Sequence, residues 1–305
     1  MNRSESAAGA TESATGATGG APRSAIQLHT LRGIDESLPD TIRRVADAGF
    51  EGVEFAGAFL DANPHRVREA LDETGIVPVA AHVDLRTLEG DLESIADRCR
   101  HVGCAHVVIP HLGAGYFRTS THVDALARRL EGLAGRLDAH GLQLSYHTSR
   151  EPFLPMLDRF GLGPVAALPS PGIVWERAAE AIDLTVRGLD RTVEKTGFAR
   201  LVSRTGDLTF EVDVGWVTAA GYDPVDVFDL LGSRLSLIHI ADVARTRRFP
   251  PSFRSVTPGE GLLDLERVLR AARGTGVDWL VFEDDDPSPP EIAVERGLRV
   301  LSGTD

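Results

Sequence analysis

Three residues that can bind a divalent cation stand at the ends of three successive apolar runs. FEVD ends at Asp213, LIHI contains His239, and LVFE ends at Glu283. Parallel strands of a barrel present their functional groups at their C-terminal ends. Mg, Mn and related cations prefer carboxylate oxygens combined with one or two imidazoles. The pattern therefore predicts a catalytic metal site formed by Asp213, His239 and Glu283.

A fourth ligand is expected from the preceding run, where YHTSREPF offers His147 at a strand end and Glu151 just beyond it. A metal at such a site polarises a carbonyl or a pair of hydroxyls, so that a nearby carboxylate can take a proton. We interpret Glu283 or Glu151 as the group that moves the proton. His147 or His82 would orient substrate hydroxyls.

Other polar residues at strand ends are expected around the same barrel mouth. Glu54, His82 and His111 follow the second, third and fourth apolar runs and would contact substrate or serve as structural polar residues. Trp216 would form an apolar wall for a sugar ring or pack against the neighbouring helix. The run Asp284–Asp286 is expected to be a solvated acidic loop.

Apolar runs alternate with amphipathic helical stretches from Ala25 onward, which is typical of repeated βα units. Strands are expected at 25–31, 52–57, 76–85, 106–112, 142–147, 208–213, 234–240 and 278–284, and helices at 38–48, 64–73, 88–101, 121–139, 173–198 and 290–301. Neither a GxGxxG after the first strand nor a Walker-type loop is present. The prediction is an α/β fold of the (β/α)8 TIM-barrel type over residues 24–305. A disordered tail is expected at 1–23, and residues 148–206 form an enlarged connection, an insertion or lid, after strand five.

Composition narrows the function classes. Of 305 residues, 42% are hydrophobic and 25% charged, and the formal net charge is −13. An acidic surface disfavours nucleic acid, and no apolar run approaches the roughly 18 residues of a membrane span. Cys99 and Cys104 match neither a zinc knuckle nor a disulfide framework, which favours a reducing cytoplasm. The expected partner is a small sugar-like substrate. A homo-oligomer is compatible with the sequence, which does not determine oligomeric state.

Several motifs resemble those of the xylose isomerase-like TIM-barrel superfamily, in particular its sugar phosphate isomerase/epimerase members. The resemblance spans about residues 25–302, and its motifs are FEVDVGWVTAAGYDP, LIHIAD, VFEDDD, VTPGEGLLDLERVLRAA, GFEGVEFAG and AHVDL. It implies that Asp213, His239 and Glu283 bind a divalent metal such as Mn, Mg, Co or Zn.

Two positions depart from the family pattern. Where members often read YHNHxxEF, this chain has Pro152 at the expected glutamate, and Glu151 lies one residue early. Glu151 is then the fourth ligand, or three protein ligands are completed by water. Ala241 stands in place of the lysine of the family's HxKD motif.

The resemblance implies a metal-dependent isomerase or epimerase acting on a sugar, sugar phosphate or keto-sugar in carbohydrate metabolism. A dehydratase or lyase acting on a polyol or keto acid would use the same metal. A non-catalytic ligand-binding relic is also consistent with the two departures. An apurinic-site endonuclease, which shares the fold, needs three metals and a basic groove that the sequence does not show.

Overall fold

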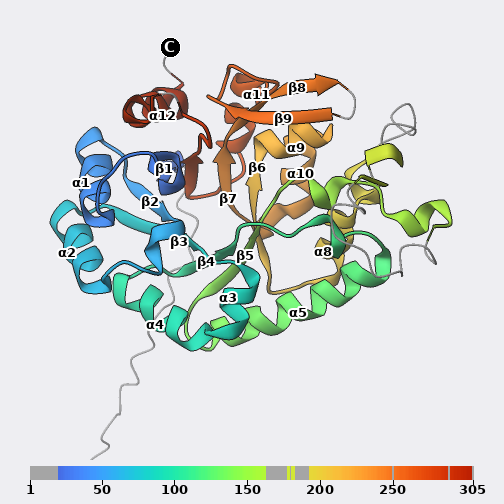
Figure 1. Cartoon of the computed structure of the whole chain (residues 1–305), viewed down its shortest axis with the longest axis horizontal. Helices are drawn as coiled ribbons and strands as arrows, with labels where there is room; N and C mark the ends of the chain where they lie inside the picture. The colour runs from blue at the N-terminus through green and yellow to red at the C-terminus, as the bar shows by residue number, and fades with distance from the viewer. Residues whose placement is uncertain are drawn as a thin grey trace, which may run out of the picture.

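A closed barrel of eight parallel strands forms the centre of the molecule (Figure 1). The computed structural model describes residues 20–162, 177–178, 180–182, 192–248, 251–287 and 289–303. Around the barrel the strand order is β1-β10-β7-β6-β5-β4-β3-β2. The strands are β1 (Arg23–Gln27), β2 (Gly52–Phe55), β3 (Val77–His82), β4 (His106–Ile109), β5 (Gln143–His147), β6 (Thr209–Asp213), β7 (Leu235–Ile240) and β10 (Trp279–Phe282). This arrangement confirms the predicted (β/α)8 fold.

Helices surround the barrel and cover its outer face (Figure 1). The α-helices are α1 (Leu38–Ala48), α2 (Pro64–Thr74), α3 (Leu85–Gly90), α4 (Leu92–Val102), α5 (Ser120–Asp138), α8 (Gly197–Arg204), α9 (Val214–Ala220), α10 (Pro224–Leu231), α11 (Leu265–Ala272) and α12 (Ala293–Ser302). Short 3₁₀ turns are η1 (Leu28–Leu31), η2 (Gly57–Phe59), η3 (Ala114–Tyr116), η4 (Glu151–Phe153), η5 (Leu157–Phe160), η6 (Val193–Lys195), η7 (Gly232–Arg234) and η8 (Pro290–Ile292). No helix in this part of the chain is long and apolar enough to cross a membrane.

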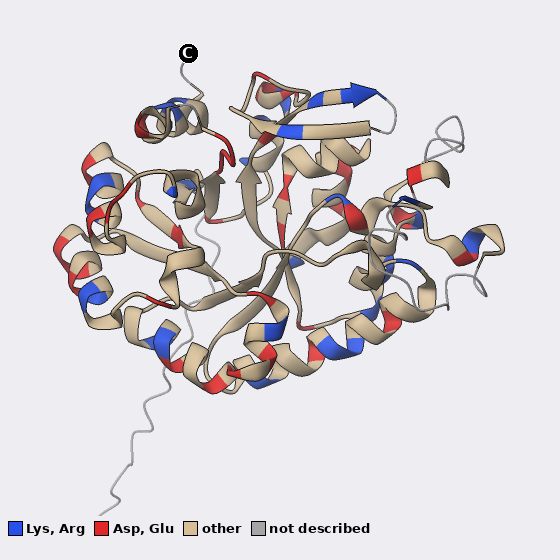
Figure 2. Ribbon diagram, in the orientation of Figure 1, with Lys and Arg blue, Asp and Glu red and all other residues tan. Residues whose placement is uncertain are grey.

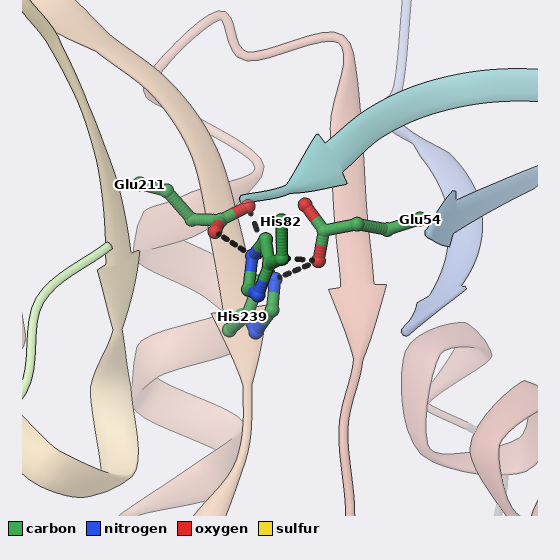
Figure 3. Close-up of side chains that lie close together, drawn as sticks. All are labelled: Glu54, His82, Glu211 and His239. Carbon is green, nitrogen blue, oxygen red and sulfur yellow. Dashed lines mark hydrogen bonds and ion pairs between the residues drawn. The ribbon is translucent and has the colours of Figure 1, made fainter. Parts of the chain in front are cut away.

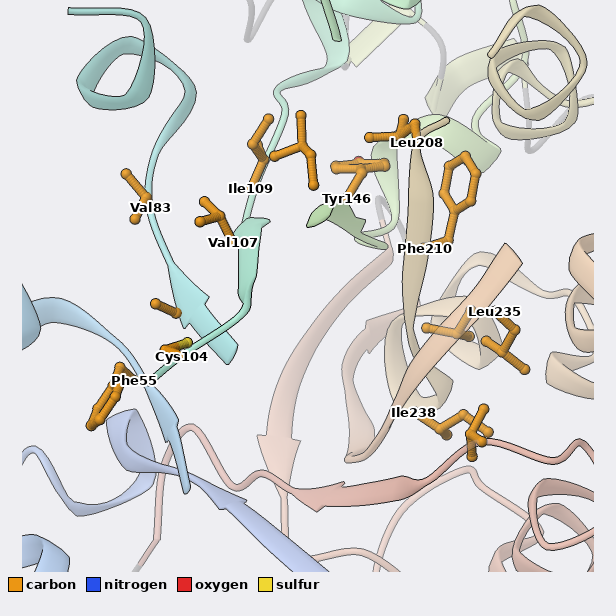
Figure 4. Packing of buried hydrophobic residues seen from close by; sticks show 14 of the residues in the cluster. Phe55, Val83, Cys104, Val107, Ile109, Tyr146, Leu208, Phe210, Leu235 and Ile238 are labelled. Carbon is orange, nitrogen blue, oxygen red and sulfur yellow. The ribbon is translucent and has the colours of Figure 1, made fainter. Parts of the chain in front are cut away.

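Alternation along the strands separates an apolar outer face from a partly polar inner face. In β6, Phe210 and Val212 belong to the large apolar cluster between barrel and helices, whereas Glu211 lies 2.9 Å from His82 of β3, across the barrel. Figure 4 shows the outer side chains of several strands packed together. The strands thus bury their outer faces against helices and hold polar residues inside.

Helix boundaries follow local capping signals. Ser37 caps α1 by accepting a hydrogen bond from the backbone N–H of Asp40, and Gly49 ends the helix with φ of 108°. A left-handed residue at this position favours glycine, which has no Cβ. Both ends of α1 agree with the prediction. The helix predicted at 88–101 is instead the pair α3 and α4, which meet at Asp91.

A two-stranded antiparallel hairpin, β8 (Asp242–Arg248) with β9 (Pro251–Val256), follows β7 and was not predicted. Asp242 anchors its base by accepting backbone N–H groups from Val243, Gly259, Gly261, Leu262 and Leu263. A Cβ on Gly261 would lie 2.4 Å from the Asp242 carboxylate, so the close approach requires glycine. This contact explains why glycine is required at the end of the PGEG segment, residues 258–261.

The predicted tail and the predicted insertion both include residues that the structure does not describe. Of the predicted tail 1–23, residues 1–19 lie outside the described residues, and β1 already begins at Arg23. Within the predicted insertion 148–206, residues 163–176, 179 and 183–191 lie outside them. The first strand also ends earlier than predicted, because the chain turns into η1 at Leu28.

Candidate active site

Barrel pairing brings the predicted ligands to neighbouring strand ends. Asp213 of β6 pairs with His239 of β7, and His239 pairs with Val281 of β10, two residues before Glu283. His147 is the last residue of β5 and pairs with Glu211. Four potential ligands therefore come from four consecutive strands of the closed sheet.

One donor atom from each of His147, Asp213, His239 and Glu283 lies within 4.8 Å of the others. We call these four residues the mouth group. His239 Nδ1 lies 2.8 Å from Glu283 Oε2, and His147 Nε2 lies 3.7 Å from Asp213 Oδ2 and 3.9 Å from Glu283 Oε2. All four side chains are buried. Such a set of oxygens and imidazoles suits a divalent cation.

Two of these donor atoms are held in place but have no hydrogen-bond partner. His147 Nδ1 lies 3.2 Å from the carbonyl oxygen of Pro110, so it donates there and leaves the Nε2 lone pair free. Asp213 Oδ1 caps α9 by accepting the backbone N–H of Trp216 at 2.7 Å, which leaves Oδ2 free. Both His147 Nε2 and Asp213 Oδ2 are buried without a partner. Since buried polar atoms are normally satisfied, this pair of atoms points to a cation between them.

A second cluster, which we call the interior group, consists of Glu54, His82, Glu211 and His239. Figure 3 shows the two carboxylates on either side of the two imidazoles. His239 Nε2 lies 2.7 Å from Glu54 Oε2 and 3.0 Å from Glu211 Oε1, and His82 Nε2 lies 2.9 Å from Glu211 Oε2. Each imidazole Nε2 thus faces carboxylates at ion-pair distance. Because His239 donates through Nε2, its Nδ1 is directed at the mouth group, the usual arrangement behind a ligating histidine.

Burial and neighbouring charges determine the protonation states in both groups. Burial lowers the pKa of His147 to about 4, so its imidazole is neutral. Burial opposes charge on His239, but the carboxylates of Glu211, Glu54 and Glu283 outweigh it and hold the pKa of His239 well above its usual value. Burial together with the charge of Glu283 raises the pKa of Asp213 well above its usual range. His239 and Asp213 therefore keep their protons to higher pH than usual, and a bound cation would displace them.

Carboxylates and imidazolium groups also stabilise one another within the site. Burial would raise the pKa of Glu283, but the positive charge of His239 lowers it to about 2. In the interior group the carboxylates of Glu54 and Glu211 overcome burial and raise the pKa of His82 to about 10. The interior group is accordingly a set of buried ion pairs that fixes the ring of His239.

A cavity of about 740 Å³ opens above the mouth group, a volume within the range of small-molecule sites. The predicted site residues that line it are His82, His111, His147, Glu151, Trp216 and Glu283. Asp285 also lines it, and burial together with Glu283 raises the pKa of this carboxyl to about 7.

Glu54 and Glu151 both lie outside the mouth group. Glu54, expected to contact substrate or to serve as a structural polar residue, is fully buried and contacts His239 and His82. Glu151, expected as the fourth ligand, begins the turn η4 beyond β5 and lines the cavity, and His147 completes the mouth group instead. His147 belongs to the mouth group because it is the last residue of β5 and lies on the inner face of the barrel.

The acidic run after β10 is solvated only in part, because Asp286 is exposed and Asp284 is buried. Asp284 is 1% exposed; it accepts a hydrogen bond from Thr257 Oγ1 and another from the backbone N–H of Asp286. Glu211 was not predicted as a site residue. The signal for it was available, because Glu211 lies two residues before Asp213 in a strand and must share its face.

A family model described as xylose isomerase-like TIM barrel matches residues 175–303. This match covers 129 of the 305 residues and includes Asp213, His239 and Glu283. The resemblance to xylose isomerase-like TIM barrels is confirmed. The chain has no match among the curated proteins.

Several solved xylose isomerase-like or related barrels share the fold. A sugar phosphate isomerase/epimerase from Parabacteroides distasonis ATCC 8503 is 15% identical with a TM-score of 0.66, over 94% of this chain and 96% of that one. An IolI protein with a bound zinc atom is 14% identical with a TM-score of 0.60, over 92% and 95%. The probable 3-DHS dehydratase AsbF from Bacillus anthracis, involved in petrobactin synthesis, is 13% identical with a TM-score of 0.62, over 91% and 98%. At such identities the likeness shows the fold alone.

Proposed function

We propose that this protein is a divalent-metal-dependent isomerase or epimerase acting on a sugar or sugar derivative. The observation that carries the proposal is the pair of buried, unpartnered donors, His147 Nε2 and Asp213 Oδ2, 3.7 Å apart at the mouth of the barrel. The similar fold of a sugar phosphate isomerase/epimerase and of a zinc-binding IolI protein supports it.

The proposed ligands are His147 Nε2, Asp213 Oδ2, His239 Nδ1 and the carboxylate of Glu283. Imidazole and carboxylate donors of this kind suit Mn, Co, Zn or Mg. When bound, a divalent cation polarises adjacent substrate oxygens and acidifies the neighbouring C–H or O–H. The chain itself keeps His147 neutral and Glu283 ionised, which are the protonation states that ligands need.

Proton movement is assigned to carboxyl groups that line the cavity and are not needed as ligands. Glu151 Oε2 is buried and has no hydrogen-bond partner. A base at this position removes a proton from a carbon beside a carbonyl and returns it to the neighbouring carbon, whereas inversion needs a second proton donor on the opposite face. Asp285, which also lines the cavity, is the second carboxyl group assigned to proton movement. Trp216 contributes an apolar wall to the cavity.

A dehydratase using the same ligands is the second candidate, because the probable 3-DHS dehydratase AsbF has a similar fold. Dehydration and epimerisation begin with the same proton removal but differ in their products. Only dehydration expels a hydroxyl group as water.

The test is turnover of a panel of aldoses, ketoses, sugar acids and sugar phosphates in deuterated water. The protein is loaded with Mn²⁺, Mg²⁺, Co²⁺ or Zn²⁺, and the products are followed by mass spectrometry and NMR. We expect uptake of solvent deuterium at a carbon next to a carbonyl, without loss of water. A product lighter by one water assigns the dehydratase instead.

The matched variants for this test are Asp213→Asn and Asp223→Asn. Both residues cap a helix through a side-chain oxygen, but only Asp213 belongs to the mouth group. We expect turnover to be lost in Asp213→Asn and retained in Asp223→Asn. Unchanged turnover in Asp213→Asn removes the metal-dependent mechanism.

A further inference from the structure

The lining of the same cavity also contains three arginines, Arg150, Arg177 and Arg247. Arg150 lies between β5 and η4, and Arg247 lies on β8 of the unpredicted hairpin. The Nη1 atoms of Arg150 and Arg177 lie 2.8 Å and 3.9 Å from the carboxylate of Glu180. Guanidinium groups that line a cavity attract negative charge locally, although carboxylates line other parts of this cavity.

Arg150 is a buried cation with unused hydrogen-bonding capacity. It is 9% exposed, and its Nη1 donates to Glu180 Oε1 at 2.8 Å. Its Nη2 is buried without a partner. An unsatisfied buried donor is costly, more so on a charged group. Glu180 therefore holds the guanidinium in place, while Nη2 lacks an acceptor.

The hairpin of β8 and β9 contributes Arg247 to the cavity lining, because Arg247 pairs with Ser252, next to Phe253. Phe253 of β9 lines the cavity, and its ring lies 5.5 Å from the guanidinium carbon of Arg150. Arg247 on β8 lines the cavity and forms no ion pair within the part of the chain that the structure describes. Arg247 and its neighbour Arg248 are both exposed, but Arg248 does not line the cavity. Figure 2 shows the basic residues along the hairpin.

We propose that Arg150 and Arg247 form a subsite for an anionic group, a carboxylate or a phosphate, on the sugar-like substrate. The inference rests on the proposed function, since it concerns the same cavity. Guanidinium groups bind both kinds of oxyanion through charge-assisted, often paired hydrogen bonds. The anion supplies the acceptor that Arg150 Nη2 lacks, while the reacting part of the substrate lies at the mouth group.

The test measures equilibrium binding by calorimetry with two matched pairs of probes in about 0.15 M salt, where long-range attraction is screened. Galacturonate is compared with galactose, and glucose 6-phosphate with glucose. The Asp213→Asn protein is used alongside the wild type, so that turnover is not required for the measurement. We expect at least one anionic probe to bind more tightly than its neutral counterpart in both proteins.

The arginine variants localise the effect. Arg247→Gln is expected to weaken binding of the anionic probe about tenfold to a hundredfold and to leave the neutral sugar unchanged. Arg248→Gln, one residue away, is expected to change neither. Arg150→Gln is expected to act like Arg247→Gln, with Arg150→Lys restoring part of the binding because it keeps the charge.

The outcomes separate this inference from the proposed function. A preference only for glucose 6-phosphate assigns phosphate, and a preference only for galacturonate assigns carboxylate. Equal binding of charged and neutral probes overturns the subsite. Equal losses of binding affinity in Arg247→Gln and Arg248→Gln also overturn it, and so does the absence of binding by any probe. If turnover fails everywhere but the anion preference persists and depends on Arg247, the subsite stands and the reaction assignment fails.

Discussion

His147 Nε2 and Asp213 Oδ2 face each other across 3.7 Å, both buried and neither hydrogen-bonded. Each is the free end of a side chain whose other polar atom is fixed, on the Pro110 carbonyl in one case and the Trp216 N–H in the other. The backbone thus holds two donors ready for a shared partner, which is the condition for a preorganised metal site.

Separating the two roles of Asp213 is the most direct check of this relationship. Asp213→Asn keeps the oxygen that caps α9 but loses the anionic ligand, so metal content should fall while the free energy of unfolding changes little. Asp213→Ala also loses the cap, which costs about 1 kcal/mol. Metal content measured by mass spectrometry and unfolding by urea give the two readouts. Equal metal content in wild type and Asp213→Asn would contradict the ligand assignment.

Glu211 should act on the metal through His239. In Glu211→Gln the imidazole loses one of the two carboxylates beside Nε2, so we expect metal affinity to fall about tenfold to a hundredfold. Glu51→Gln serves as a control, because the Glu51 side chain is exposed. Competition with a fluorescent chelator measures the affinity. Wild-type affinity in Glu211→Gln would mean that the interior group does not orient the ligand.

Glu151 is expected to affect catalysis without affecting metal binding, because it lies outside the mouth group and lines the cavity. Glu151→Gln should keep the metal and lower kcat by about 10²–10⁴. Metal content and steady-state kinetics on the same preparation distinguish the roles. Loss of metal in this variant would restore Glu151 as a ligand, as first predicted from the sequence.

Metal binding should release protons, with a definite pH dependence. Neighbouring carboxylates raise the pKa of His239, and burial raises the pKa of Asp213. Both groups therefore keep their protons to higher pH than usual, and a bound cation must displace them. Protons compete with metal, and apparent affinity should therefore rise with pH. Calorimetry in two buffers of different ionisation enthalpy counts the released protons. An affinity that is flat between about pH 6 and 8 would oppose this assignment.

His106 provides a pH test of stability away from the mouth. Its Nε2 lies 2.8 Å from Ser145 Oγ, and burial lowers its pKa from 6.5 to about 4. The unfolded chain thus binds a proton between these two pH values that the folded chain does not. Stability from this residue is present above about pH 6.5 and is lost as pH falls toward 4, by up to about 1.4 kcal/mol per pH unit. His106→Gln should flatten the urea-unfolding profile in that window, and a profile parallel to wild type would refute the interpretation.

The repeating βα pattern was enough to predict the barrel and the range of α1. The residues that end this helix in the structure, Ser37 and Gly49, act within a few residues of their own position, so the signals for its limits are local. Asp213, His239 and Glu283 could also be singled out, because strand ends of a parallel barrel converge on one face. The alternation in TFEVD carried the information for Glu211 as well.

Tertiary structure alone decided which polar residues meet. His239 contacts Glu54, 185 residues away in the chain, because barrel closure places β2 and β7 across a shared interior. The choice of His147 over Glu151 depends on where β5 ends and η4 begins, and the arginine-bearing hairpin has no periodic signal strong enough to predict it. Sequence patterns describe contacts within a few residues, whereas the register and closure of eight strands determine contacts across the barrel.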